Sequence, residues 1–364
     1  MYIDYVHFYV EDAKKWRNWF VNVMGFLVIA SGENVHTLTE VVGNVGNKDN
    51  SPIIFVLSSP LTLFSPVTKF LQKHPSGVVE IAFSVDDLEK IINNNAQIFE
   101  PIEERISSEG RVKWSQIKNP ANLKHTLIER QGKTPIIPEL NLTEIAYIPT
   151  QQSNFNKIDH LVLNVASGEL ANTANWYETV LEFEKKQSFR IQTEQSGLYS
   201  QVMVHPVSGV QIPINEPSSP NSQIQEFLDI NQGSGIQHIA LQTSKIVQLT
   251  ESLRLAGLSF LKVPKNYYEQ ISNKNEQKII ELLELEALIK QEILIDLEID
   301  HNLVNSTNYP LLLQIFTQPI FEKPTFFFEL IERREQAKGF GEGNFRALFE
   351  AIEREQIKRG NLII

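Results

Sequence analysis

The amino-acid sequence predicts an α+β fold in which one unit of strands and helices occurs twice in tandem. Three pairs of segments match in the same order along the chain: residues 3–10 with 158–165, 77–83 with 235–241, and 126–130 with 329–333. The matched segments have the apolar content and alternation of β-strands, and helical patterns lie between them. We therefore expect two consecutive modules that follow the same plan.

The composition is that of a globular protein. The chain has 364 residues, enough for more than one domain, with 42% hydrophobic and 21% charged residues. Its formal net charge of −11 argues against binding to nucleic acid or anionic membranes. No apolar run approaches the roughly 20 residues of a membrane helix, no signal peptide is evident, and no cysteine is present. We therefore expect a cytoplasmic protein without disulfides or thiolate metal sites.

The repeat also predicts the domain boundary. The first domain covers residues 1–150 and the second covers residues 157–364, with a polar stretch around Gln151 and Gln152 as the linker. Each copy has the order strand, helix, strands, helix, strand. The second copy contains an additional insertion between Leu261 and Pro310.

Local patterns define the elements in order. Residues 3–10 alternate between two faces as a strand does, and residues 12–23 form an amphipathic helix that ends before Gly25. Within the insertion, residues 276–291 lack glycine and proline and predict a helix with one apolar side.

The C-terminal segment combines a glycine-rich loop with a helix. The loop extends from Gly339 to Asn344, and the predicted helix covers residues 345–359. Its apolar face contains Phe345, Leu348, Phe349 and Ile352. This helix could be a hinged lid over a site or a helix docked permanently on the core, and the sequence leaves both possibilities open.

Three matched positions differ in chemistry between the copies. They are Tyr5, Glu80 and Thr126 in the first copy, and His160, His238 and Glu329 in the second. Two imidazoles and one carboxylate on three strands are typical of a facial iron site, although they could also hold zinc. A phenylalanine-rich surround favours iron. The second copy is therefore the expected metal-binding half.

Each of these residues also has an ordinary structural interpretation. A single strand histidine is more often a hydrogen-bonded core residue than a metal ligand. Glu329 could instead pair with Arg333 or Arg334, although a residue so near on the same strand reaches poorly. An unpaired buried carboxylate is costly. The three positions together therefore favour a metal site more than any one does alone.

Motifs across the second half resemble the 4-hydroxyphenylpyruvate dioxygenase family of the vicinal oxygen chelate superfamily. They occupy residues 158–160, 213–217, 235–241, 312–317, 328–333 and 339–345. The resemblance implies two tandem modules of paired βαβββ units, the C-terminal one an open barrel with the metal, followed by a C-terminal helix. It also implies Fe²⁺ held by His160, His238 and Glu329, and conversion of 4-hydroxyphenylpyruvate and O2 to homogentisate and CO2.

The resemblance further implies two groups of residues around the metal. A polar network would comprise Ser200, Asn215, Gln223, Gln237 and Gln314. A pocket for the aromatic ring would comprise Phe316, Phe327, Phe340, Asn344 and Phe345. Gln237 does not share a face with His238 in a flat strand, so its role requires a twist or bulge.

The sequence leaves three alternative functions open. A 4-hydroxymandelate synthase would use the same substrate, and a phenylalanine at position 345 favours the dioxygenase. An extradiol catechol dioxygenase would need a further acid-base histidine, for which His205 is the available residue. A non-catalytic binding module would not retain iron. A homo-oligomer is expected in addition.

Overall fold

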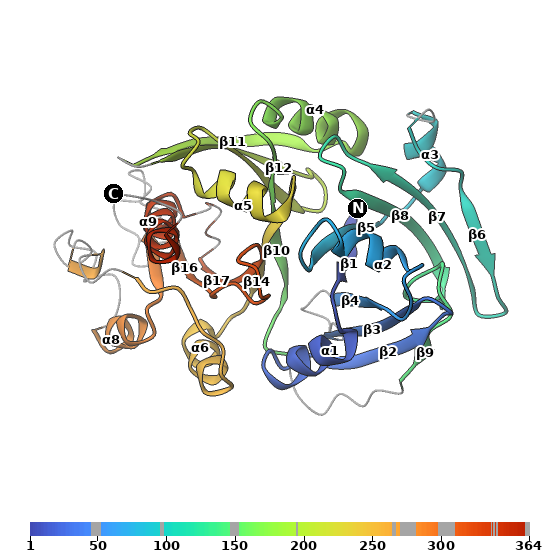
Figure 1. Cartoon of the computed structure of the whole chain (residues 1–364), viewed down its shortest axis with the longest axis horizontal. Helices are drawn as coiled ribbons and strands as arrows, with labels where there is room; N and C mark the ends of the chain where they lie inside the picture. The colour runs from blue at the N-terminus through green and yellow to red at the C-terminus, as the bar shows by residue number, and fades with distance from the viewer. Residues whose placement is uncertain are drawn as a thin grey trace.

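The chain forms two curved sheets that lie side by side, one from each half (Figure 1). The structure is a computed structural model that describes residues 1–44, 52–94, 98–145, 153–193, 196–263, 267–269, 282–297, 310–335, 337, 339 and 341–360. Each sheet is mixed, with helices packed against it. The predicted α+β fold of two tandem modules is confirmed.

The first half contains a nine-stranded sheet in the order β6-β7-β8-β5-β1-β4-β3-β2-β9. Its first βαβββ unit consists of β1 (Tyr2–Tyr9), α1 (Ala13–Asn22), β2 (Leu27–Glu33), β3 (Thr37–Asn44) and β4 (Ile53–Pro60). After α2 (Pro66–Leu71), the second unit consists of β5 (Gly77–Ser84), α3 (Leu88–Asn93), β6 (Glu103–Ile106), β7 (Gly110–Lys118) and β8 (Lys124–Gly132). The short strand β9 (Thr143–Glu144) pairs with β2.

The second half repeats this plan in an eight-stranded sheet, ordered β11-β12-β13-β10-β14-β17-β16-β15. Its first unit consists of β10 (Lys157–Asn164), α4 (Leu170–Leu181), β11 (Glu184–Gln192), β12 (Gly197–Val204) and β13 (Gln211–Pro217). After α5 (Gln223–Asn231), the second unit consists of β14 (Gly235–Gln242), α6 (Ile246–Leu255), α8 (Leu282–Lys290), β15 (Leu294–Leu297), β16 (Leu311–Phe316) and β17 (Phe327–Arg334). The final helix is α9 (Glu342–Arg359).

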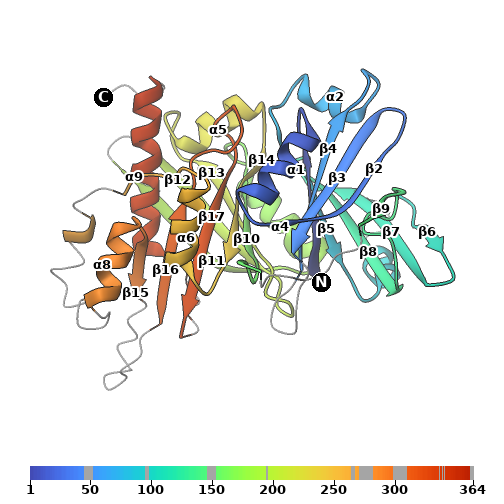
Figure 2. The same cartoon turned by 90° about the horizontal axis from the view of Figure 1, so that it is seen from below.

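Helix α9 bridges the opening of the second sheet. Phe349 packs against Leu198 of β12, and Leu348 clusters with Phe316 of β16, so the helix contacts both sides of the curve. Figure 2 shows α9 running alongside the strands of this half. Its apolar face is the one predicted from the sequence. None of the helices in the described ranges is long and apolar enough to cross a membrane.

The two halves share one hydrophobic core. Phe8 contacts Phe326 with ring centroids 5.1 Å apart, and Phe20 contacts Phe328 at 5.9 Å. These rings are almost fully buried, and burial of large aromatic side chains is a major stabilising contribution. The first half is therefore part of the platform on which β17 and the second half rest.

Most of the predicted elements agree with the structure, but the predicted loop at residues 339–344 is too long, because α9 already begins at Glu342 after the positive-φ residue Gly341. Asp12 caps α1 by accepting a hydrogen bond from the backbone N–H of Lys15 at 3.0 Å. Of the helix predicted at residues 276–291, the structure describes α8, in which Leu285 and Leu288 are buried. Residues 276–281 lie outside the described residues, and Gln291 lies in a turn directly after α8.

Candidate metal centre

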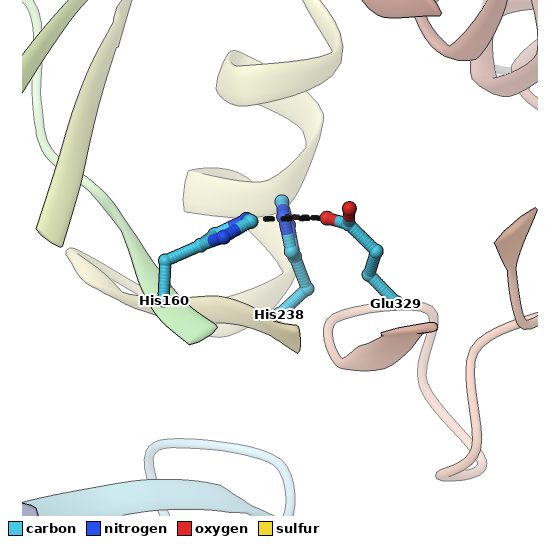
Figure 3. Close-up of side chains that lie close together, drawn as sticks. All are labelled: His160, His238 and Glu329. Atoms are coloured by element: carbon cyan, nitrogen blue, oxygen red, sulfur yellow. Dashed lines mark ion pairs between the residues drawn. The ribbon is translucent and has the colours of Figure 1, made fainter. Parts of the chain in front are cut away.

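Three ligand-type side chains converge inside the second sheet. Nε2 of His160 lies 3.2 Å from Oε2 of Glu329, and Nε2 of His238 lies 3.6 Å from the same oxygen. Figure 3 shows the three side chains pointing toward one another. One ligand atom from each lies within 4.8 Å of the others, and all three residues are buried. Two nitrogen donors and one carboxylate at such separations fit a divalent metal ion.

Strand register produces this convergence. The ligands come from β10, β14 and β17, which are neighbours in the sheet. His160 is opposite Ala240, and Ala240 is opposite Glu329, so one row across three strands carries two of the ligands. His238 lies two residues before Ala240 and projects from the same face. Ala240, with its small side chain, lies between His160 and Glu329 in this row.

The protonation equilibria of the three residues are coupled. Burial alone would raise the pKa of Glu329, but the positive charge of His160 and hydrogen bonds from both imidazoles lower it to about 2. Burial alone would lower the pKa of His160, but Glu329 and Asp159 raise it to about 9. The pKa of His238 is lowered by burial. Glu329 is therefore ionised, and its charge attracts a cation in this place.

The first copy fills the equivalent place with its own side chains. Tyr5 donates a hydrogen bond to Glu80 at 3.1 Å, and the hydroxyl of Thr126 donates to the same oxygen. The ammonium of Lys124 lies 2.8 Å from the other oxygen of Glu80, and Nδ1 of His7 lies 3.3 Å from it. Burial raises the pKa of Glu80, but the bond from His7 and the charge of Lys124 lower it to about 2. Here the counter-charge is a lysine.

Gln314 and Asn344 form a hydrogen-bonded chain behind Glu329. The side-chain N–H of Gln314 donates to Oε1 of Glu329 at 2.8 Å, and the side-chain N–H of Asn344 donates to the oxygen of Gln314 at 2.9 Å. The Tyr267 hydroxyl donates to the oxygen of Asn344 at 2.6 Å. Asn344 is in the first turn of α9, so this chain connects the carboxylate to the base of that helix.

A cavity of about 40 Å³ opens beside the two histidines. Four predicted polar residues line it together with His160 and His238: Ser200, Asn215, Gln223 and Gln237. The side-chain oxygen of Gln223 is buried and has no hydrogen-bond partner in the described structure. The opposite wall is the apolar face of α9, with Phe345, Leu348, Phe349 and Ile352. The cavity thus has a polar side and an apolar side next to the two histidines.

A β-bulge explains how Gln237 reaches this cavity beside His238. Strand β14 pairs with β10 so that His238 is opposite Val162 and Ile236 is opposite Leu163. Gln237 is therefore the extra residue of the bulge. The twist or bulge that the predicted position of Gln237 requires is therefore present in β14.

The predicted phenylalanines have different surroundings. Phe345 lines the cavity and packs on Phe189 with ring centroids 5.2 Å apart. Phe327 stacks on the ring of His238 at 4.7 Å, and Phe316 lies edge-on to both. Neither Phe316 nor Phe327 lines the 40 Å³ cavity. Phe340 lies outside the described residues.

Sequence reasoning missed two residues behind the centre, Asp159 and Arg333. Asp159 accepts two hydrogen bonds from Arg333 at 2.8 Å and lies 2.9 Å from Nδ1 of His160. Arg334 pairs with Glu332 and Glu284, so neither arginine has the predicted alternative role as the partner of Glu329. The signal was present, because Asp4 and Arg130 occupy the matching positions of the first copy.

Comparison with known proteins places the chain in a family. The family model "Glyoxalase/Bleomycin resistance protein/Dioxygenase superfamily" matches residues 157–270. The 4-hydroxyphenylpyruvate dioxygenase of Dictyostelium discoideum is 36% identical, with 99% of both chains covered. The enzyme of that name from Coccidioides posadasii is 35% identical over 99% of this chain and 94% of that protein.

Solved structures agree on the fold. A mutant of 4-hydroxymandelate synthase from Streptomyces coelicolor superimposes with a TM-score of 0.82 over 98% of each chain, at 23% identity. At that identity the likeness concerns the fold, whereas the full-length relatives above share more than a third of their residues with this chain. The chain therefore belongs to the 4-hydroxyphenylpyruvate dioxygenase family of the vicinal oxygen chelate superfamily.

Proposed function

We propose that this protein converts 4-hydroxyphenylpyruvate and O2 to homogentisate and CO2, with Fe²⁺ held by His160, His238 and Glu329. The observation that carries the proposal is that the two histidines of the triad line a cavity with one polar and one apolar wall, the latter including Phe345 and Phe349. The substrate has the same division, a 2-oxo acid at one end and a phenol ring at the other. The full-length relatives named for this activity support the assignment.

A ferrous ion held by His160, His238 and Glu329 would supply a binding place for the 2-oxo acid and the redox chemistry that activates dioxygen, with the net electrons coming from the substrate. The protein side chains would set the charge and the geometry around the metal. Glu329 neutralises part of the metal charge, and Gln314 fixes the orientation of that carboxylate. Three protein ligands leave the other coordination positions free for substrate and dioxygen.

Neutral side chains would orient the substrate. Ser200, Asn215, Gln223 and Gln237 can donate and accept hydrogen bonds without adding charge beside the metal. Asn215 is itself held by Asn164, to whose oxygen it donates at 3.3 Å. The apolar face of α9 would exclude water from the reacting ring. A cavity of about 40 Å³ holds only a few water molecules, so admission of the substrate requires α9 or its side chains to move.

Product analysis tests the assignment. Protein loaded with Fe²⁺ and given 4-hydroxyphenylpyruvate in air should produce homogentisate and CO2 in equal amounts. His160→Ala should abolish turnover, whereas His7→Ala, which removes a buried histidine beside Glu80 in the first copy, should retain it. 4-Hydroxymandelate as the sole product would contradict the proposal.

A 4-hydroxymandelate synthase is the second candidate, favoured by the fold likeness to that enzyme. The two activities differ in whether the ring or the benzylic carbon is hydroxylated. Phe345 lines the cavity at α9, where it would limit how the ring is placed. Phe345→Ile should increase the share of 4-hydroxymandelate if this wall directs attack to the ring. An unchanged ratio of 4-hydroxymandelate to homogentisate would show that Phe345 does not determine which carbon is hydroxylated.

The extradiol alternative lacks its required histidine in the described structure. His205 follows β12, with its ring packed on Phe183 and its Nδ1 bonded to Ser208. It is absent from the residues that line the cavity. A catechol offered in place of the 2-oxo acid should therefore not be cleaved.

A further inference from the structure

Asp159 contacts a metal ligand even though it precedes that ligand by one residue. In a regular strand, neighbouring side chains point to opposite faces. The pairing of β10 with β14 shifts between Ile158 and His160, so Asp159 is the extra residue of a β-bulge. Its carboxylate therefore turns toward the imidazole, with Oδ1 lying 2.9 Å from Nδ1 of His160.

Arg333 holds this carboxylate in place. It donates through Nε to Oδ2 and through Nη2 to Oδ1 of Asp159, both at 2.8 Å, in the bidentate geometry that orients both groups. Its third nitrogen, Nη1, donates to the backbone oxygens of Gly339 at 2.6 Å and Ala337 at 3.2 Å. Asp159 is 4% exposed, so the pair is held away from bulk water.

The first copy contains the same pair without the histidine. Arg130 donates through Nε to Oδ2 of Asp4 at 3.0 Å and through Nη2 to Oδ1 at 2.8 Å. The β1 pairing also shifts between Ile3 and Tyr5, so Asp4 occupies an equivalent bulge. The pair is therefore a structural feature of both modules, and only in the second does its aspartate contact a metal ligand.

The two histidines of the triad are held differently. The Nδ1 atom of His238 is buried and has no hydrogen-bond partner in the described structure. Its ring is instead stacked on Phe327, with centroids 4.7 Å apart and planes 17° from parallel. Asp159 is thus the carboxylate that can set the tautomer of a ligand imidazole in this centre.

We propose that Asp159, clamped by Arg333, is a positioning residue for the metal centre. It accepts the Nδ1–H of His160, so the lone pair of the neutral ring is on Nε2, the nitrogen that faces Glu329. It also fixes the plane of the ring. This inference rests on the metal centre of the proposed function but does not depend on which substrate is used.

Metal affinity tests the proposal with a matched control. Co²⁺ binding to the metal-free full-length protein would be measured by isothermal titration calorimetry for wild type, Asp159→Asn and Asp4→Asn. Each variant leaves one half-buried arginine with a neutral amide in place of its carboxylate partner, so both should lower the unfolding temperature. Only Asp159→Asn should weaken Co²⁺ binding, by about 10- to 100-fold, as is usual when the carboxylate partner of a ligand histidine is lost.

The results of these titrations distinguish the positioning role of Asp159 from the existence of the metal centre. Wild-type affinity in Asp159→Asn, or an equal loss in Asp4→Asn, would overturn the positioning role and leave the metal centre intact. Failure of the wild type itself to bind Co²⁺ would contradict both. If Asp159→Asn does not fold, Arg333→Gln takes its place with Arg130→Gln as its match. The first should weaken Co²⁺ binding and the second should not, and equal affinities would again refute the role.

Discussion

His125 makes the stability of the junction between the halves dependent on pH. This residue of β8 is fully buried, and its Nε2 lies 2.9 Å from the hydroxyl of Tyr177 in α4 of the other half. Its ring also stacks on Trp176 at 5.7 Å. Burial lowers the pKa of His125 from 6.5 to about 4, so the folded protein holds the ring neutral. In the unfolded chain the same ring takes up a proton below pH 6.5.

The sign and size of the effect follow from this difference. Between pH 6.5 and 4 the unfolded state binds one more proton, so stability falls as the pH falls. One pKa unit corresponds to about 1.4 kcal/mol. The loss should be about 2 kcal/mol at pH 5 and about 3 kcal/mol below pH 4, on an order-of-magnitude scale.

Urea unfolding at pH 8 and at pH 5 measures this loss. The difference in unfolding free energy between wild type and His125→Gln should shrink by about 2 kcal/mol over that range, since the variant has no group to titrate. Tyr177→Phe is the control, because it removes the hydroxyl partner but keeps the buried imidazole. It should lower stability at both pH values and keep the wild-type slope. A pH-independent difference between wild type and His125→Gln would refute the reasoning.

Three further predictions concern α9 and the metal. Gly341→Ala should lower the unfolding free energy by about 1–3 kcal/mol. Residue 341 has φ of +73°, and an added Cβ would collide with the side-chain oxygen of Gln314. Wild-type stability of this variant in urea would contradict the prediction. Glu353 of α9 accepts hydrogen bonds from Ser196 at 2.6 Å and Thr193 at 2.7 Å. Glu353→Ala should therefore cost about 2 kcal/mol or more, whereas Glu355→Ala, at an exposed ion pair, should cost under about 1 kcal/mol. Chelation should lower the melting temperature of the metal-loaded protein, and Co²⁺ at a hundred times its dissociation constant should restore about 2.7 kcal/mol of stability. Glu329→Gln should show little of that recovery, and full recovery would exclude Glu329 as a ligand.

Much of the fold could be predicted because the chain repeats its own pattern. The match of Tyr5, Glu80 and Thr126 with His160, His238 and Glu329 predicted the three candidate ligands at equivalent positions on three strands. Pairing of β10 with β14 and β17 then brings them together, since equivalent strands occupy equivalent places in each sheet. Comparing the two copies within this one chain was therefore enough to predict the three candidate ligands.

The contacts behind the ligands could not be predicted in the same way. Whether Gln314 faces the substrate or Glu329 depends on a side-chain rotamer, and the structure has it donating to Glu329. The direction of Asp159 depends on a bulge, which breaks the alternation on which strand predictions depend. The two copies have identical residues at these positions, Asp4 with Asp159 and Arg130 with Arg333. This identity indicates a shared structural role, which a comparison that considers only the differences between the copies does not reveal.

Lys124 gives the two halves different requirements during assembly. The first half carries the counter-charge of its buried glutamate in its own covalent chain, 2.8 Å from Glu80. That centre is electrically balanced as soon as β5 and β8 pair, whatever the surrounding solution contains. In the second half Phe327 occupies the corresponding register position, so the positive charge beside Glu329 must come from protonated imidazole or from an ion taken up from outside. A shortage of metal would therefore leave the charge of Glu329 in the second half to the imidazoles alone. The charge of Glu80 in the first half would still be balanced by Lys124.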